Sequence, residues 1–131
     1  MTWKCPTCGM DNAPGVRFCI GGCGYARIAA RVVLTSEATG KKLRMHISTP
    51  VGRSLLRTLA EGDAAYASEP QFEIVRDEER GAWMIRHSAG ARNPTYFNDL
   101  KIGDEMPSLA DGAHISIGRE RMKLTVNLED V

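Results

Sequence analysis

Alternation of apolar and polar residues is the main pattern after residue 27. Apolar positions two residues apart occur over 32–34 and over 43–47, on either side of the glycine-containing turn 38–41. Successive side chains of a β-strand point to opposite faces, so this alternation predicts two strands that each bury one face. The turn between them predicts a β-hairpin.

The same pattern recurs further along the chain. Residues 72–74 and 83–85 alternate around the charged turn 76–81, and residues 113–117 and 122–128 alternate around a turn at Gly118. Short strands spaced by about ten residues are typical of antiparallel sandwiches. The sequence therefore predicts a mainly β fold with a sandwich of antiparallel strands.

One stretch has helical spacing instead. From Ser54 to Tyr66, the apolar residues Leu55, Leu56, Leu59 and Ala60 recur at intervals that put them on one helical face. We predict a single helix there, inserted into the sandwich.

Composition and charge limit the classes of function that we expect for this chain. Hydrophobic residues make up 43% and charged residues 25%, so the chain can bury a core. Up to Ala26 the charges are Lys4 and Arg17 against Asp11, and the remainder holds 15 basic and 15 acidic residues. A duplex-binding surface needs a clear basic excess, so nucleic-acid binding is not expected. Trp3, Lys4, Arg17 and Phe18 offer some stacking and charge, but two cations are few.

Neither a membrane span nor a secretory signal is expected. No run approaches the roughly 20 apolar residues that cross a bilayer, and residues 1–6 contain no apolar signal region. We expect a cytoplasmic protein, in which thiols stay reduced and clustered cysteines are more often metal ligands than disulfides.

The four cysteines lie in two close pairs near the N-terminus, Cys5 with Cys8 and Cys19 with Cys23. A glycine follows the second cysteine of each pair, and Pro6 favours a tight turn in the first. Two such turns supply four thiolates to one tetrahedral ion, and a site with four protein ligands is structural. We predict one Zn²⁺, while a redox pair, an iron centre and two disulfides remain open alternatives.

This segment resembles a zinc ribbon, with the four cysteines as its ligands. A piece of this size cannot bury a core, so the metal is expected to fold it. We assign residues 1–26 to the zinc ribbon and residues 27–131 to the sandwich. The short, partly apolar connection favours a docked arrangement over a flexible tether.

The second part resembles a forkhead-associated (FHA) domain in the order of several short motifs. These are Gly52-Arg53, Ser68, Phe72-Glu73-Ile74-Val75, Trp83-Met84-Ile85, Asn93-Pro94-Thr95-Tyr96-Phe97-Asn98, Leu109-Ala110-Asp111-Gly112 and Ile115-Ser116-Ile117-Gly118. The resemblance implies an eleven-stranded β-sandwich whose loops bind phosphothreonine peptides.

The resemblance also implies roles for four residues. Arg53 would steady the peptide and the phosphate, Ser68 would bond a phosphate oxygen, and Asn93 would hold the peptide backbone. Arg92 stands where the family usually has a hydroxyl residue, and its guanidinium would clamp the phosphate instead.

Four positions depart from the family pattern. Glu69 replaces a basic residue and would repel a phosphate, and Gln71 replaces a buried histidine that braces the binding loop. Pro94 and Asp99 replace turn glycines, so altered backbone angles are expected at both turns.

No catalytic constellation is visible, and His46, His87 and His114 are expected to be packed or surface side chains. We therefore predict a non-enzymatic adaptor that binds a threonine-phosphorylated protein. The alternative is a phosphate-independent assembly module with a degenerate FHA domain. The oligomeric state and the partner's identity are left open.

Overall fold

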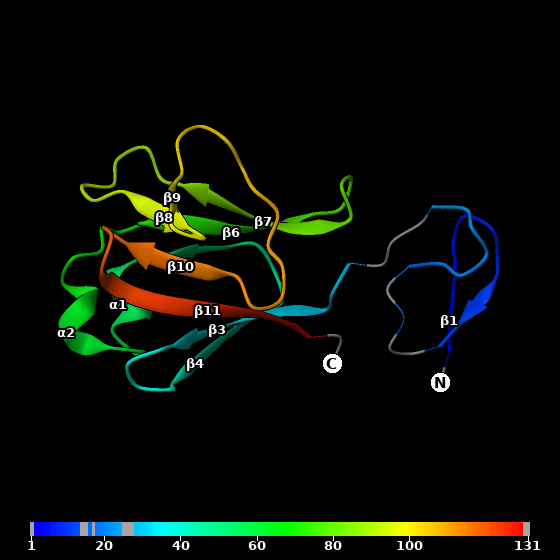
Figure 1. The fold of residues 1–131 in the computed structure, drawn as a ribbon, viewed down its shortest axis with the longest axis horizontal. Helices are drawn as coiled ribbons and strands as arrows, with labels where there is room; N and C mark the ends of the chain where they lie inside the picture. Colours follow the sequence, from blue (N-terminus) through cyan, green and yellow to red (C-terminus); the bar gives the residue numbers. More distant parts are fainter. Residues whose placement is uncertain (1, 14–15, 17, 25–27, 130–131) are drawn as a thin grey trace.

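Two antiparallel sheets form the main body of the protein in a computed structural model that describes residues 2–13, 16, 18–24 and 28–129. The larger sheet has six strands in the order β4-β3-β11-β10-β8-β9, and the smaller has three in the order β5-β6-β7. The larger sheet consists of β3 (Arg31–Ser36), β4 (Lys42–Met45), β8 (Thr95–Phe97), β9 (Leu100–Lys101), β10 (His114–Ile117) and β11 (Arg121–Glu129). The smaller sheet consists of β5 (Thr49–Val51), β6 (Phe72–Asp77) and β7 (Ala82–His87). Figure 1 shows the two layers.

The three predicted hairpins are confirmed. β3 pairs with β4, β6 pairs with β7, and β10 pairs with β11. Alternate residues of these strands face the core, which includes Leu34, Phe72, Ile74, Trp83, Ile85, Ile115, Ile117 and Leu124. The mainly β, antiparallel sandwich is therefore confirmed, because each strand has the side-chain period of two that its sequence shows.

The number of strands differs from the family expectation. Among the described residues the two sheets hold six and three strands, rather than eleven. Ser108 pairs with Met84 only as an isolated bridge beside β7. Asn98 and Asp99 form the turn between β8 and β9 with positive φ values of 50° and 67°. The aspartate thus takes a left-handed conformation that glycine adopts more readily.

The single helix predicted over 54–66 is wrong. The chain forms two one-turn helices, α1 (Arg53–Leu56) and α2 (Glu61–Ala64), at one end of the sandwich (Figure 1). Between them the backbone becomes extended at Ala60, with φ −155° and ψ 98°. The Thr58 hydroxyl donates to the Leu55 carbonyl at 2.6 Å, which offers the first turn a local alternative to helix continuation.

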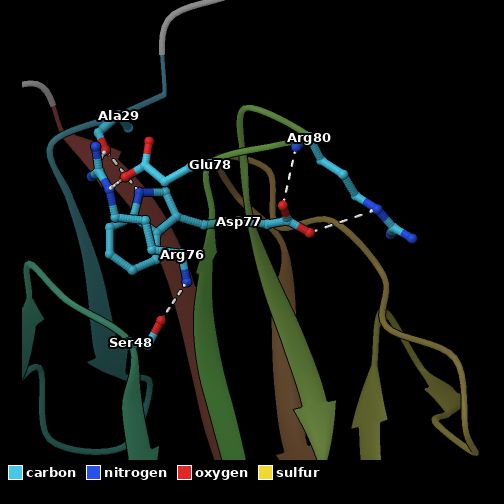
Figure 2. Close-up of polar contacts among 7 residues, drawn as sticks. Ala29, Ser48, Arg76, Asp77, Glu78 and Arg80 are labelled. Atoms are coloured by element: carbon cyan, nitrogen blue, oxygen red, sulfur yellow. Dashed lines mark hydrogen bonds and ion pairs between the residues drawn. The ribbon is translucent and has the colours of Figure 1, made fainter.

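The chain enters the sandwich at the end opposite to these helices, and the Ala29 carbonyl anchors it there. Trp83 Nε1 donates to this carbonyl at 2.8 Å, and Arg76 Nη1 donates to it at 3.1 Å. The Arg76 guanidinium also lies 5.4 Å from the centre of the Trp83 ring. Figure 2 shows Arg76 reaching across to Ala29, with Glu78 and Ser48 bound to the same arginine.

The N-terminal segment is a small separate sheet. β1 (Trp3–Lys4) pairs with β2 (Asp11–Asn12) around the first cysteine pair. The predicted boundary between Ala26 and Arg27 lies outside the described residues. Within the described residues, no helix has the length and apolar character needed to cross a membrane.

Candidate functional site

The four cysteines converge on one point. One sulfur from each of Cys5, Cys8, Cys19 and Cys23 lies within 4.8 Å of the other three. Cys5 Sγ is 3.6 Å from Cys23 Sγ, and Cys8 Sγ is 3.4 Å from Cys19 Sγ. Sulfurs bound tetrahedrally at ~2.3 Å from zinc would be about 3.8 Å apart. The four thiols are not joined in disulfides, and their arrangement fits one metal ion.

The two cysteine pairs lie on tight turns whose glycines have positive φ. Gly9 has φ 76° and Gly24 has φ 84°, as expected of the residue that follows each pair. In the first turn, Gly9 N–H donates to the Cys5 carbonyl at 2.8 Å, and Cys5 N–H donates to the Met10 carbonyl at 2.9 Å. These bonds fold residues 5–10 so that both sulfurs point the same way.

The thiols influence one another's ionisation. Burial opposes ionisation of Cys5, but backbone N–H groups of Cys8 and Thr7 outweigh it and lower the Cys5 pKa to about 6. The Met10 N–H lowers the Cys8 pKa, but hydrogen bonding to Cys19 and burial outweigh it and raise that pKa to about 12. A bound cation would be needed for all four to be thiolates together.

A second candidate site lies at the helical end of the sandwich, where three loops meet. Arg53 follows β5, Ser68 precedes β6, and Arg92 and Asn93 precede β8. Arg53 N–H donates to the Ser68 carbonyl at 3.2 Å, and Arg53 Nε donates to the Ala67 carbonyl at 3.1 Å. The exposed Arg53 side chain is thereby tied to the loop that carries Ser68.

The third loop is bound to the same segment. Arg92 backbone N–H donates to Ser68 Oγ at 2.9 Å, and Asn93 Nδ2 donates to the Tyr66 carbonyl at 2.7 Å. Ser68 Oγ accepts from Arg92, so its own proton is left to donate. The structure thus brings Arg53, Ser68, Arg92 and Asn93 together, although the first and last are 40 positions apart in the sequence.

The buried side chain of Gln71 connects the loop of Ser68 with the loop of Asn93. It is 0% exposed, and its Oε1 accepts from Ser68 N–H at 2.9 Å. Its Nε2 donates to the Asn93 carbonyl at 2.7 Å and to Thr95 Oγ1 at 3.1 Å. Gln71 therefore braces the loops in this chain, at the position where the family resemblance implies a histidine.

Glu69 is held at the edge of the same site. Its carboxylate Oε2 accepts from the backbone N–H and the hydroxyl of Ser54, both at 2.8 Å. These two hydrogen bonds, helped by the charges of Arg53 and Arg57, lower the pKa of Glu69. A Cβ at Gly52 would come within 2.3 Å of Glu69 Oε1, so a larger residue there would displace this carboxylate.

Sequence reasoning missed Ser54, Thr95 and His87 as part of this region. His87 Nδ1 lies 2.8 Å from Thr95 Oγ1, and Ser54 holds Glu69. Their partners come from other strands and loops, so no local sequence signal marks them. His46 and His114 are exposed, whereas His87 is half-buried.

Comparison with known proteins identifies the fold. No family model and no curated protein matches the sequence. An FHA domain solved in a study of phosphothreonine-dependent interactions has a TM-score of 0.59 and 20% identity, covering 77% of this chain and 99% of that one. The FHA domain of an Arabidopsis thaliana hypothetical protein has a TM-score of 0.61 and 23% identity, covering 83% of this chain and 95% of that one.

A third similar structure is Mycobacterium tuberculosis EmbR, solved with a low-affinity phosphopeptide. It has a TM-score of 0.60 and 19% identity over 88% of this chain, but only 27% of that longer chain. The sandwich described here therefore has the fold of FHA domains.

Proposed function

We propose that this chain, whose sandwich has the FHA fold, is a non-catalytic adaptor that binds a threonine-phosphorylated protein. The observation that carries the proposal is the hydrogen-bonded junction of three loops, where Arg53, Ser68 and the 92–93 segment meet. A guanidinium, a hydroxyl and an amide at one point are the groups that bind a dianionic phosphate and its peptide.

Each side chain has a role in this proposal. Arg53 supplies charge to the phosphate, and the Ser68 hydroxyl donates to a phosphate oxygen. The Asn93 side-chain oxygen accepts from the peptide backbone. Arg92, which is exposed, adds a second guanidinium that can bind two phosphate oxygens at once.

Isothermal titration against a phosphothreonine peptide library tests this function. A binder should be found, and Arg53→Ala should weaken it at least about tenfold, since a charge-assisted bond contributes about 1.5–3 kcal/mol. Arg44→Ala, at an exposed position on β4, is the matched control and should leave affinity unchanged. The absence of any binder, or equal binding by the Arg53 variant, would refute the proposal.

We also propose that the ion in the four-cysteine site is a single structural Zn²⁺. Four thiolates with no open position suit zinc, and zinc in such a site folds the segment around it. In this proposal residues 1–26 form a zinc ribbon, residues 27–131 form the FHA sandwich, and the protein works in a reducing compartment such as the cytoplasm. Metal analysis by mass spectrometry of protein purified without added metal should give one zinc per chain, and iron would contradict this assignment.

The charge of Glu69 supports a second candidate function, in which the protein takes part in assembly without binding phosphate. Its carboxylate is held by Ser54 close to Arg53 and Arg57 and offsets their charge. Capture of the partner from a lysate treated with phosphatase separates the two candidates. Capture that survives the treatment supports assembly without phosphate, and capture that is lost supports phosphothreonine binding.

A further inference from the structure

Two backbone groups fix the orientation of the Gln71 side chain. Ser68 N–H can only donate, and it lies 2.9 Å from Gln71 Oε1. The Asn93 carbonyl can only accept, and it lies 2.7 Å from Gln71 Nε2. The oxygen therefore faces the Ser68 loop and the nitrogen faces the Asn93 loop. One amide orientation satisfies both loops, and the opposite orientation satisfies neither.

The second N–H of Gln71 sets the direction of the next hydrogen bond. Gln71 Nε2 donates to Thr95 Oγ1 at 3.1 Å, and His87 Nδ1 lies 2.8 Å from the same oxygen. Thr95 is 0% exposed, so its hydroxyl proton needs a partner inside the protein. That proton has an acceptor at this distance only if His87 Nδ1 carries no proton. The geometry thus favours a neutral His87 with its proton on Nε2, because only this tautomer accepts the buried Thr95 proton.

We propose that His87 is a positioning residue for the phosphopeptide loops and that its protonation weakens peptide binding. The neutral ring accepts from Thr95, Thr95 accepts from Gln71, and Gln71 holds Ser68 and Asn93 in place. A protonated ring donates to Thr95 instead, which leaves the buried Thr95 proton without this acceptor and disturbs Gln71. The effect on binding rests on the function proposed above, but the effect on the loops does not.

Protons can reach His87 from solvent. The residue lines an open pocket of about 530 Å³ together with Ser68, Glu69, Glu73 and Arg86. Glu73 is paired with Arg86 across the β6–β7 hairpin, and Lys101 on β9 adds a positive charge. Burial first, and then the charge of Lys101, lower the pKa of His87 below its ordinary value of 6.5. The ring is therefore neutral at pH 7 and becomes protonated on acidification.

Nuclear magnetic resonance of the peptide-free protein tests the hydrogen-bond direction. At pH 7.5 the ring nitrogens of His87 should show the tautomer with the proton on Nε2. On acidification, the amide signals of Ser68 and Thr95 should shift with the same midpoint as His87, below pH 6.5. The exposed His46 is the control, and His46→Ala should leave these shifts unchanged. A proton on Nδ1 at pH 7.5, or Ser68 and Thr95 signals that do not follow His87, would overturn the proposal.

Phosphopeptide titrations at pH 7.5 and pH 5 test the effect on binding. The peptide phosphate itself gains a proton near pH 6, so the wild-type protein must be compared with His87→Gln. The glutamine oxygen can accept from Thr95 at every pH. We expect the wild type to lose about threefold more affinity than His87→Gln once His87 is protonated. Equal losses of peptide affinity in the wild type and in His87→Gln would contradict the proposal.

Thr95→Val gives an independent check, because it removes the hydroxyl and keeps the shape of the side chain. It should abolish the link between His87 protonation and the Ser68 amide signal, and an intact link would contradict the proposed route. If no phosphopeptide binds at all, the proposed function fails, while the amide shifts of the peptide-free protein still decide the role of His87.

Discussion

At the scale of single residues, we expect Glu69 to oppose the proposed binding of phosphate. It directly follows Ser68, and its carboxylate is held by Ser54 and lies near Arg53 and Arg57. Glu69→Gln removes the negative charge at nearly constant shape, so phosphopeptide affinity should rise by about two- to fivefold, more at low salt. Titration calorimetry measures this change. Glu79→Gln, in the turn at the far end of β6, is the control, and equal affinities of the two variants would show that Glu69 does not repel the ligand.

The lowered pKa of Glu69 also has a consequence for stability. Its hydrogen bonds from Ser54 favour the ionised form, so the pKa in the folded protein lies below the ordinary value of 4.5. The stabilisation is therefore present at neutral pH and is lost as the pH falls through this lowered pKa. Urea unfolding of wild type and Glu69→Gln should differ at pH 7 and converge as the pH falls from 4.5 through the lowered pKa. A difference that stays constant with pH would contradict this.

At the scale of elements, the Ala29 carbonyl ties the start of β3 to the β6–β7 hairpin. Trp83 is 1% exposed and donates one of the two hydrogen bonds to this carbonyl. Trp83→Phe removes that donor and leaves a smaller aromatic ring in the core, so it should destabilise the sandwich by at least about 1–3 kcal/mol in urea unfolding.

A surface variant at the same end of the hairpin provides the control. Arg80 is exposed and pairs with Asp77 at 3.7 Å. Arg80→Ala should change stability by less than about 1 kcal/mol, as expected of surface ion pairs. A Trp83→Phe protein as stable as the Arg80 variant would mean that the Ala29 anchor contributes little.

At the scale of the whole molecule, the metal should hold the N-terminal segment and leave the sandwich intact. The two-stranded sheet of residues 3–12 has little core beyond the cysteines, whereas the sandwich has its own large core. Chelation should therefore remove or collapse the amide signals of residues 2–24 and retain those of β3 to β11. Loss of the sandwich signals as well would show that the two parts share their stability.

Local patterns in the sequence determined two features of this protein. Alternation over 32–47, 72–85 and 113–128 predicted the three hairpins, because strand side chains have a period of two and each hairpin closes over a short turn. The spacing of the cysteine pairs predicted their convergence, because each pair lies within one turn of chain. Both depend on residues that are neighbours in sequence.

Only the tertiary structure decided the features that depend on contacts between residues far apart in the sequence. Helical spacing over 54–66 could not show that the backbone becomes extended at Ala60 between two separate one-turn helices. It also could not show that Gln71 would take over the brace between the Ser68 and Asn93 loops, or that Thr95 would connect Gln71 to His87. These bonds join separate loops and strands, and only the packing of the sheets brings their atoms within reach.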